Sequence, residues 1–343
     1  MRVLAFSVWL LAATAAADEP AVTFTEPEIR AILAHGPWPV PPGTDASNPL
    51  SGKRGAIQLG EILFFEKRLS PGGKFACNNC HVPERNWTDN RTRGAAIAEV
   101  DRNTPTLMNL RLGHQFGWDG ATDALWKQSL RPMLDARELG TTARQVADLL
   151  RNDEQLSCRY RKAFGAPPSA TDDQAVMTHV AQALAALVET FETPPTPFDR
   201  FRNALARGEP IMPWVYSEAA QRGAKVFFGK GDCSSCHSGP NFSDGKLHDN
   251  GFSRLAAPGR PDPGRNGLFK VPTLRHLMLT APYGHHGEVA TLADAVRHYS
   301  ETGSSEIKPL RLSAAEQSDL VVFLESLSTL SNPWRPEDLG RCF

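Results

Sequence analysis

The hydrophobic pattern of the chain is helical in four places. Apolar residues recur every three or four positions after four polar pairs: Thr142-x-x-Gln145, Thr171-x-x-Gln174, Thr291-x-x-Asp294 and Ser313-x-x-Glu316. A small polar residue three positions before a side chain that can bond back to the backbone is typical of a helix start. No segment shows a convincing alternation of a half-buried strand. The pattern therefore predicts a mainly α protein.

The helix expected in "TLADAVRHYSE" (291–301) places a histidine beside a tyrosine. At about 100° per residue, one face is apolar and carries the tyrosine. That face holds Leu292, Ala295, Val296 and Tyr299. The opposite face holds Asp294, Arg297 and His298. We therefore expect Tyr299 to face inward and His298 to be solvated or at a rim.

Two stretches rich in Pro and Gly, 193–200 ("TPPTPFDR") and 257–267 ("APGRPDPGRNG"), read as loops. The chain of 343 residues is long enough for two domains. Taking the first stretch as a linker places the boundary near residue 205. The predicted domains are then 18–205 and 206–343.

The first 17 residues resemble a secretory signal. Arg2 precedes an apolar stretch from Val3 to Ala13, and Ala15 to Ala17 form a small-residue cleavage site. The apolar stretch is too short to span a bilayer, which takes about 20 residues. We expect an exported, periplasmic protein with no membrane span, whose mature chain begins at Asp18.

The balance of charged residues bears only on which partners are disfavoured. The chain has 37 Lys and Arg against 38 Asp and Glu. There is no basic surplus of the kind that follows a nucleic-acid backbone or anionic lipid. The balance therefore argues against nucleic-acid partners.

An imperfect internal repeat contains the residues that indicate a cofactor. Residues 60–89 and 223–244 share G-x-x-[LV]-F-F, then C-x-x-C-H, then N-[WF]-[TS]-D. C-x-x-C-H is the attachment signature of c-type haem: two thiols form thioethers and the histidine ligates the iron. One haem would use Cys77, Cys80 and His81, and the other would use Cys233, Cys236 and His237.

The C-x-x-C pairs could instead form a zinc site or a redox dithiol. Zinc ribbons space such pairs by about 15–20 residues, far less than here. A redox dithiol needs no following histidine. The remaining cysteines, Cys158 and Cys342, either form a disulfide or stay separate buried thiols, and the sequence leaves both open.

From Gly60 to Leu330 the chain resembles the bacterial di-haem cytochrome c peroxidases and their MauG-type relatives. The resemblance rests on "LFFEKRLSPGG", "RNTPTLMNL", "GWDG", "ELG", "CSSCHSGPNFSDG" and "VPTLRHLMLTAPYGHHG". It implies two cytochrome c-like haem domains in tandem. The N-terminal haem is expected to react with peroxide, and the C-terminal haem to transfer electrons.

The resemblance also implies roles for single residues. Trp118 looks like the tryptophan that bridges the haems, Glu138 like the acid-base residue of the peroxide site, and Gln128 like its polar companion. One Ca²⁺ is expected, with oxygen ligands from Asn103, Thr280 and Pro282.

In two features the chain differs from many cytochrome c peroxidases of this family. Residues 82–113 hold no histidine of the kind that blocks the peroxide site in many of these peroxidases, and we interpret His114 as structural. Fourteen residues beyond His285, where cytochrome c peroxidases have a methionine ligand, stands Tyr299, and no methionine follows Met278. MauG-type enzymes have tyrosine there, so Tyr299 is predicted to ligate the second haem.

Three functions follow from these observations. The first is a MauG-like enzyme that uses hydrogen peroxide to oxidise a Trp or Tyr of a partner protein by long-range electron transfer. The second is a cytochrome c peroxidase that removes peroxide with electrons from a small cytochrome or cupredoxin. The third is a non-enzymatic di-haem electron carrier.

Overall fold

The computed structural model describes residues 22–255, 262, 264–330 and 334–343. The predicted signal segment and most of the predicted 257–267 loop lie outside these residues. Among the described residues, no helix is both long and apolar enough to cross a membrane.

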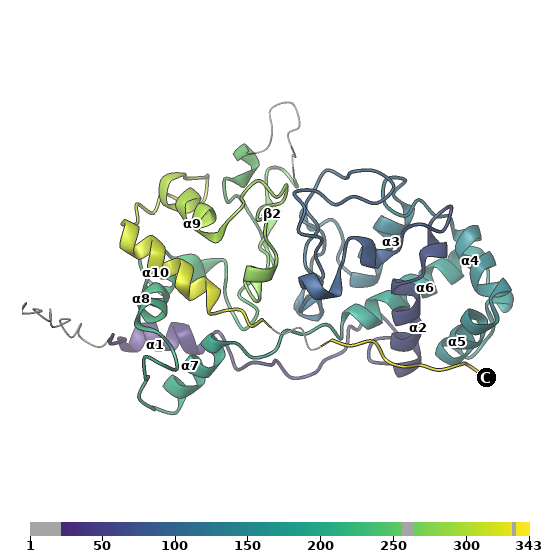
Figure 1. Ribbon diagram of the computed structural model, residues 1–343, viewed down its shortest axis with the longest axis horizontal. Helices are drawn as coiled ribbons and strands as arrows, with labels where there is room; N and C mark the ends of the chain where they lie inside the picture. Colours follow the sequence, from purple (N-terminus) through teal and green to yellow (C-terminus); the bar gives the residue numbers. More distant parts are fainter. Residues whose placement is uncertain (1–21, 256–261, 263, 331–333) are drawn as a thin grey trace, which may run out of the picture.

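The structure is mainly α, as predicted, with its helices gathered in two lobes (Figure 1). One lobe contains α2 (Arg54–Phe64), α3 (Leu125–Leu134), α4 (Ala143–Asn152), α5 (Glu154–Phe164) and α6 (Asp173–Val188). The other contains α1 (Glu26–Leu33), α7 (Pro197–Ala206), α8 (Glu218–Phe228), α9 (Leu292–Glu301) and α10 (Ala314–Glu325). Two short antiparallel strands, β1 (Leu247–His248) and β2 (Phe269–Lys270), pair in the second lobe.

Each lobe has its own apolar core. In the first lobe α2 packs against α6, and in the second α8 packs against α10. The packing is close at Gly60 and Gly223, the corresponding glycines of the repeat. A Cβ at either position would clash with a backbone carbonyl of the facing helix, that of Ala183 or Asp319. The repeated glycine is therefore explained by helix packing.

The two ends of the chain cross between the lobes. Ile32 of α1 belongs to the core of the second lobe, whereas Trp334 packs against the core of the first. A disulfide between Cys158 and Cys342 ties the C-terminal tail to α5, with a Cα separation of 6.0 Å. Of the two alternatives left open for these cysteines, the structure has the disulfide.

The stretch around residue 205 differs from the expected linker. Residues 197–200, predicted as loop, begin α7, because Thr196 and Asp199 cap its first turn and Pro197 suits the first helical position. Phe198 and Phe201 of α7 pack in the second core. The division at residue 205 stays a prediction, and these contacts favour a boundary before α7.

The predicted helix starts can be compared with the observed caps. Thr142, Thr291 and Ser313 cap α4, α9 and α10 as expected. At α6 the cap is Asp172 instead of Thr171, because the Asp172 carboxylate accepts the N–H of Ala175. The prediction there was wrong by one residue.

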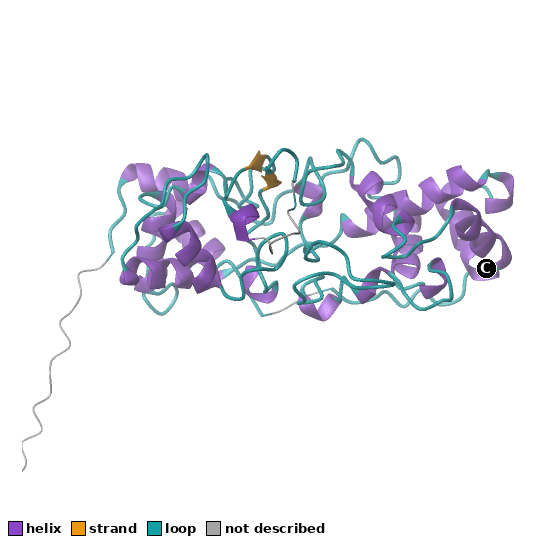
Figure 2. Cartoon of the chain, turned by 90° about the horizontal axis from the view of Figure 1, so that it is seen from above, coloured by secondary structure: helices purple, strands orange, loops and turns teal. Residues whose placement is uncertain are grey.

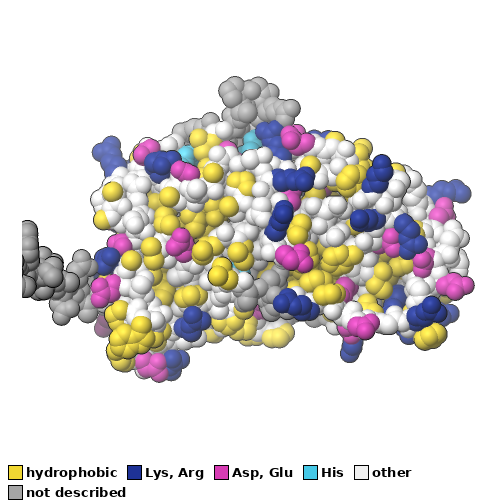
Figure 3. All heavy atoms as spheres, viewed as in Figure 1, with side chains coloured by type: hydrophobic (Ala, Val, Ile, Leu, Met, Phe, Trp, Pro, Cys, Tyr) yellow, Lys and Arg dark blue, Asp and Glu magenta, His cyan; other side chains and the backbone are white. Residues whose placement is uncertain are grey.

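Loops occupy the middle of the molecule, between the helices of the two lobes (Figure 2). On the face shown in Figure 3, basic and acidic side chains are interspersed, in keeping with a net charge of −1. The site described next lies in the loop-rich middle.

Candidate haem site

One cavity of about 2120 Å³ collects the residues that the sequence singled out. Single small-molecule pockets usually measure about 300–1,000 Å³. The cavity is therefore large enough for two cofactors. It is lined by both C-x-x-C-H motifs and by Asn103, Trp118, Gln128, Glu138, Thr280, Pro282 and Tyr299.

The first motif lies on a short 3₁₀ turn, Cys77–Asn79. His81 Nδ1 lies 2.9 Å from the carbonyl oxygen of Trp87, to which it donates. This bond fixes the tautomer and leaves the lone pair on Nε2 for a metal. Burial lowers the pKa of His81, which keeps the ring neutral.

The second motif repeats this arrangement on the 3₁₀ turn Cys233–Ser235. His237 Nδ1 lies 3.0 Å from the carbonyl oxygen of Phe242, and burial lowers the pKa of His237 to about 4. Trp87 and Phe242 occupy the same position in the N-[WF]-[TS]-D repeat. The tetrapeptide thus has a role that the sequence did not reveal: its second residue orients the histidine.

The donor set fits c-type haem. The four motif cysteines are free thiols that line the cavity, and burial raises the pKa of Cys77 and Cys233 to about 12. Each thiol pair stands beside a neutral, oriented imidazole. Covalent attachment through two thioethers and ligation by one histidine need this set at each haem.

Glu138 lies beside the first motif, in the turn that follows α3. Its charge acts on the thiols of Cys77 and Cys80, which marks it as their neighbour. Burial, followed by the charge of Asp135, raises the pKa of Glu138. A carboxyl group with a raised pKa, lining the cavity at the first motif, is suited to accept and return a proton.

Gln128 belongs to α3 and lines the same cavity. Its Oε1 accepts a hydrogen bond of 3.0 Å from the hydroxyl of Thr122, which leaves the amide NH₂ as a donor. A Cβ at Gly117 would lie 3.4 Å from this Oε1, and Gly117 has a φ of +79°. Gly117 thus lets the Trp118 loop pass close to Gln128.

Trp118 is bonded to both halves of the chain. Its Nε1–H donates to the carbonyl of Asn103 (2.8 Å), and its own carbonyl accepts the N–H of Lys270 in β2 (2.8 Å). Burial lowers the pKa of Lys270 to about 8. No pattern in the sequence pointed to Lys270. The residue reaches Trp118 only through a backbone hydrogen bond between positions that are 152 residues apart.

Tyr299 faces the cavity beside the second motif. The thiols of Cys233 and Cys236 act on its phenol, and burial raises the pKa of Tyr299. Leu292, Ala295 and Val296 line the cavity with it, so the predicted face of α9 is confirmed.

The prediction for His298 is wrong. The residue is only 8 % exposed, because the segment containing Asn250 and Phe252 covers that flank of α9. Its Nε2 lies 3.4 Å from the carbonyl oxygen of Asn250, and its ring centroid lies 4.4 Å from that of Phe252. His298 nevertheless stays on the far side of the helix from the apolar face.

For His114, the structural role stays a prediction. Its side chain is exposed and borders the cavity. Gly113 and Phe116 beside it pack together instead.

The three residues proposed for calcium all line the cavity. Asn103 donates its side-chain NH₂ to the carbonyl of Arg91 (2.7 Å), which leaves its Oδ1 for a cation. Asn90 donates to the carbonyls of Leu279 and Ala281, which hold the segment of Thr280 and Pro282. Their role as calcium ligands stays a prediction.

Sequence reasoning missed His35, which lies behind the second motif. Its Nε2 is 3.0 Å from the carbonyl oxygen of His237, and its Nδ1 is 2.8 Å from that of Ala31. His35 follows α1, in the N-terminal segment that packs on the second lobe. It lies at the second motif only because the N-terminal segment joins the lobe formed by the C-terminal half of the chain.

Comparisons with known proteins agree with this geometry. Residues 54–206 match the family model of di-haem cytochrome c peroxidase. The methylamine utilization protein MauG of Methylorubrum extorquens is 33 % identical over 92 % of this chain and 88 % of its own. The cytochrome c551 peroxidase of Nitrosomonas europaea is 31 % identical over 79 % of each chain.

Among solved structures, a MauG-like protein associated with microbial copper homeostasis has a TM-score of 0.72 at 27 % identity. The match covers 88 % of this chain and 100 % of that one. Fold, cavity and sequence identity over most of the chain point the same way. The chain belongs to the family of di-haem cytochrome c peroxidases and MauG proteins, which are haem-dependent oxidoreductases.

Proposed function

We propose that this protein is a MauG-like enzyme that uses hydrogen peroxide to oxidise a Trp or Tyr of a partner protein by long-range electron transfer. The observation that carries the proposal is the tyrosine at the second motif. Tyr299 lines the cavity there, and no methionine follows Met278 in the chain. Methionine ligation raises a haem potential, so its absence disfavours a second haem built to collect electrons from a small carrier.

Cys77, Cys80 and His81 would hold the peroxide-reactive haem, and Cys233, Cys236 and His237 the electron-transfer haem. When bound, these haems supply the iron at which peroxide reacts and oxidising equivalents reside. Tyr299 is proposed to hold the iron of the C-terminal haem together with His237. Its phenol would then have to lose its proton, which a ferric ion favours and burial alone opposes.

Glu138 is the proposed proton carrier. Breaking the O–O bond of hydrogen peroxide requires a proton to move from one oxygen to the other. Glu138 would accept the first proton and return it, and its raised pKa favours that exchange. The amide NH₂ of Gln128, oriented by Thr122, would donate to the peroxide.

Trp118 is the proposed route between the two halves of the site. Reduction of one hydrogen peroxide to two waters consumes two protons and two electrons. The partner's Trp or Tyr would supply both electrons and release two protons, which balance the two that are consumed. The hydrogen bonds of Trp118 to Asn103 and from Lys270 hold its ring at the junction that these electrons must cross.

Localisation and calcium belong to the same proposal. The predicted signal segment and the Cys158–Cys342 disulfide both support export to the periplasm, because such bonds persist in oxidising compartments. One Ca²⁺ bound by Asn103, Thr280 and Pro282 would fix the loops on either side of Trp118.

Peroxide-dependent oxidation of a reduced small c-type cytochrome tests the proposal. The measurement compares the haem-loaded wild type with Tyr299→Met. We expect slow turnover by the wild type and at least about tenfold faster turnover by the variant, a change worth about 1.4 kcal/mol. Haem content and absorption spectra of both proteins control for folding.

Rapid turnover by the wild type, unchanged in Tyr299→Met, would instead support a cytochrome c peroxidase. The similarity to the Nitrosomonas europaea peroxidase keeps this second function in view. If neither protein reacted with peroxide, the di-haem electron carrier would be favoured.

A further inference from the structure

Two histidines and an aspartate form a compact group at one side of the cavity. Potential ligand atoms of Asp262, His285 and His286 all lie within 4.8 Å of one another. His285 is 2 % exposed, His286 is 6 % exposed, and the side chain of Asp262 is 7 % exposed. Very little of these three side chains is therefore exposed to solvent.

The two imidazoles have more bonding capacity than the described residues use. His285 Nε2 is buried and has no hydrogen-bond partner among those residues, and neither has His286 Nδ1, which lies on the other edge of its ring from the Nε2 that faces Asp262. Leaving buried polar atoms unpaired costs free energy, so each such atom calls for an explanation. An ion bound beside Asp262 would account for His285 Nε2 but not for His286 Nδ1, because His286 turns its Nε2 to Asp262.

The spacing suits a metal ion. His286 Nε2 and Asp262 Oδ2 are 3.3 Å apart. A tetrahedral ion with bonds of about 2.0–2.1 Å separates its ligand atoms by about 3.3 Å. The same distance also suits a hydrogen bond, so it permits either arrangement. Stacking on Phe269, with centroids 3.7 Å apart, fixes the ring of His285.

Neighbouring charges hold the aspartate in place. Arg102 donates to both oxygens of Asp262 (2.6 and 2.9 Å) and forms a second ion pair with Asp119 (2.9 Å). Burial opposes the charge of Asp262, but the bonds from Arg102 outweigh it and lower the pKa to about 2. One arginine between two aspartates leaves one negative charge for a cation. Carboxylates that ligate metals are commonly oriented in this way.

We propose that Asp262, His285 and His286 bind a divalent transition-metal ion of the Zn²⁺ or Cu²⁺ class. Two imidazoles and one carboxylate are the ligands that such ions prefer. Calcium favours oxygen ligands, so this site differs in chemistry from the oxygen set proposed for Ca²⁺. The proposal does not depend on the reaction that the enzyme carries out.

The site is connected to Trp118 through a short chain of hydrogen bonds. The carbonyl of His285 accepts the N–H of Asn103 (2.9 Å), and the carbonyl of Asn103 accepts the indole N–H of Trp118 (2.8 Å). An ion held by His285 would therefore restrain the segment that positions Trp118. We expect metal binding to change the fluorescence or absorption of this region without adding a residue to the reaction.

Equilibrium dialysis of the haem-loaded protein, followed by elemental analysis, tests the site. The protein is stripped with a chelator, calcium is restored, and Zn²⁺ or Cu²⁺ is added separately. We expect one equivalent of either ion per chain. His286→Gln and Asp262→Asn should each weaken binding by about 10–100-fold. His179→Gln is the matched control, because His179 lies in α6, bonded to Tyr160, outside the cavity.

The proposal is overturned if the wild type retains no more zinc or copper than His286→Gln. It is also overturned if calcium displaces the ion competitively, which would make the site an oxygen-type site. A third contrary result is a change of the haem reduction potentials in both variants with no change in bound metal. The unpaired nitrogens would then be partners of haem carboxylates. Asp262→Asn keeps the test open if His286→Gln fails to fold.

Discussion

The indole N–H of Trp118 donates to the backbone carbonyl of Asn103 across 2.8 Å. Asn103 in turn donates its N–H to the carbonyl of His285, and Lys270 donates to the carbonyl of Trp118. One tryptophan is thus fixed by residues from both halves of the chain, at the cavity that both C-x-x-C-H motifs line. This relationship supports the proposed role of Trp118 as an electron route.

Trp118→Phe is expected to slow electron exchange between the two haems by at least about tenfold, or about 1.4 kcal/mol in barrier. Phenylalanine keeps an aromatic ring but loses the N–H donor and is much harder to oxidise. Rapid-mixing spectroscopy after one equivalent of peroxide measures the rate. Trp126→Phe is the control, since Trp126 lies in α3 and does not line the cavity. Equal rates in both variants would remove Trp118 from the route.

Glu138→Gln is expected to slow the reaction with peroxide by about 10²–10⁴-fold, the usual contribution of a positioned acid-base group. Glutamine keeps the shape but cannot carry a proton. Haem spectra should not change. Glu84→Gln, at an exposed glutamate in the 3₁₀ turn Pro83–Arg85 that does not line the cavity, should leave the rate unaltered. A small effect at Glu138 would favour the electron-carrier alternative.

The pH dependence of the same reaction follows from the Glu138 pKa. Burial and Asp135 raise this pKa, and the group must be ionised to accept the first proton. The rate in the wild type should therefore rise with pH through a midpoint above the ordinary value for glutamate. A flat profile over about pH 4–8, with the haem content constant, would contradict this assignment.

His248 is expected to make stability depend on pH. Its Nδ1 lies 2.6 Å from a carboxylate oxygen of Glu306, and its Nε2 lies 2.9 Å from one of Asp244. The bond to Glu306 joins β1, which contains His248, to the loop after α9. Burial opposes the imidazolium charge, but Glu306 and Asp244 outweigh it and raise the pKa of His248. A raised histidine pKa gives stability that is complete below the unfolded pKa and is lost as pH rises through the folded one.

Denaturant unfolding of the wild type and of His248→Gln measures this effect. The free energy of unfolding should differ more at about pH 6 than at about pH 9. A difference that is the same at both pH values would mean that the imidazolium form contributes nothing.

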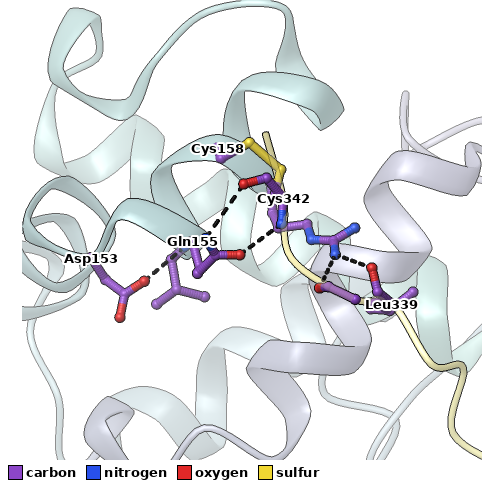
Figure 4. Close-up of a disulfide and its surroundings, with 8 residues drawn as sticks. Asp153, Gln155, Cys158, Leu339 and Cys342 are labelled. Atoms are coloured by element: carbon purple, nitrogen blue, oxygen red, sulfur yellow. Dashed lines mark hydrogen bonds between the residues drawn. A yellow bond between two sulfur atoms is a disulfide. The ribbon is translucent and has the colours of Figure 1, made fainter.

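The Cys158–Cys342 disulfide is expected to stabilise the first lobe. It holds the C-terminal tail, which also bonds to α5 through Gln155 and Arg159 (Figure 4). The double variant Cys158→Ser, Cys342→Ser should lose about 2–5 kcal/mol in the free energy of unfolding. Guanidinium unfolding of haem-loaded protein measures this, with the single variants as controls for a stray thiol. No change would mean that the remaining tail contacts suffice.

The sequence predicted what depends on short spacings. The C-x-x-C-H motifs, the caps of α4 and α10, and the phase that turns Tyr299 toward the cavity all follow from residues within one or two helical turns. Tyr299 and Leu292 lie seven positions apart, and helix geometry alone sets their relation.

The rest depends on contacts between distant segments. His298 is buried by the segment at Asn250, about 50 positions away, so helical phase alone could not reveal it. The crossing of the chain ends, which brings His35 to the second motif, leaves no periodic signal. Asp262 meets His285 and His286 only because separate loops converge, and the functional roles of the site residues remain predictions.

Low-temperature EPR of the purified ferric protein, before and after one equivalent of hydrogen peroxide, tests the central claim most directly. We predict one high-spin signal from a first haem with an open position and one low-spin signal without a methionine signature. Peroxide should abolish both signals together, with no stoichiometric amino-acid radical, because the two oxidising equivalents are shared through Trp118. Loss of the first signal alone, or two low-spin haems indifferent to peroxide, would contradict the account.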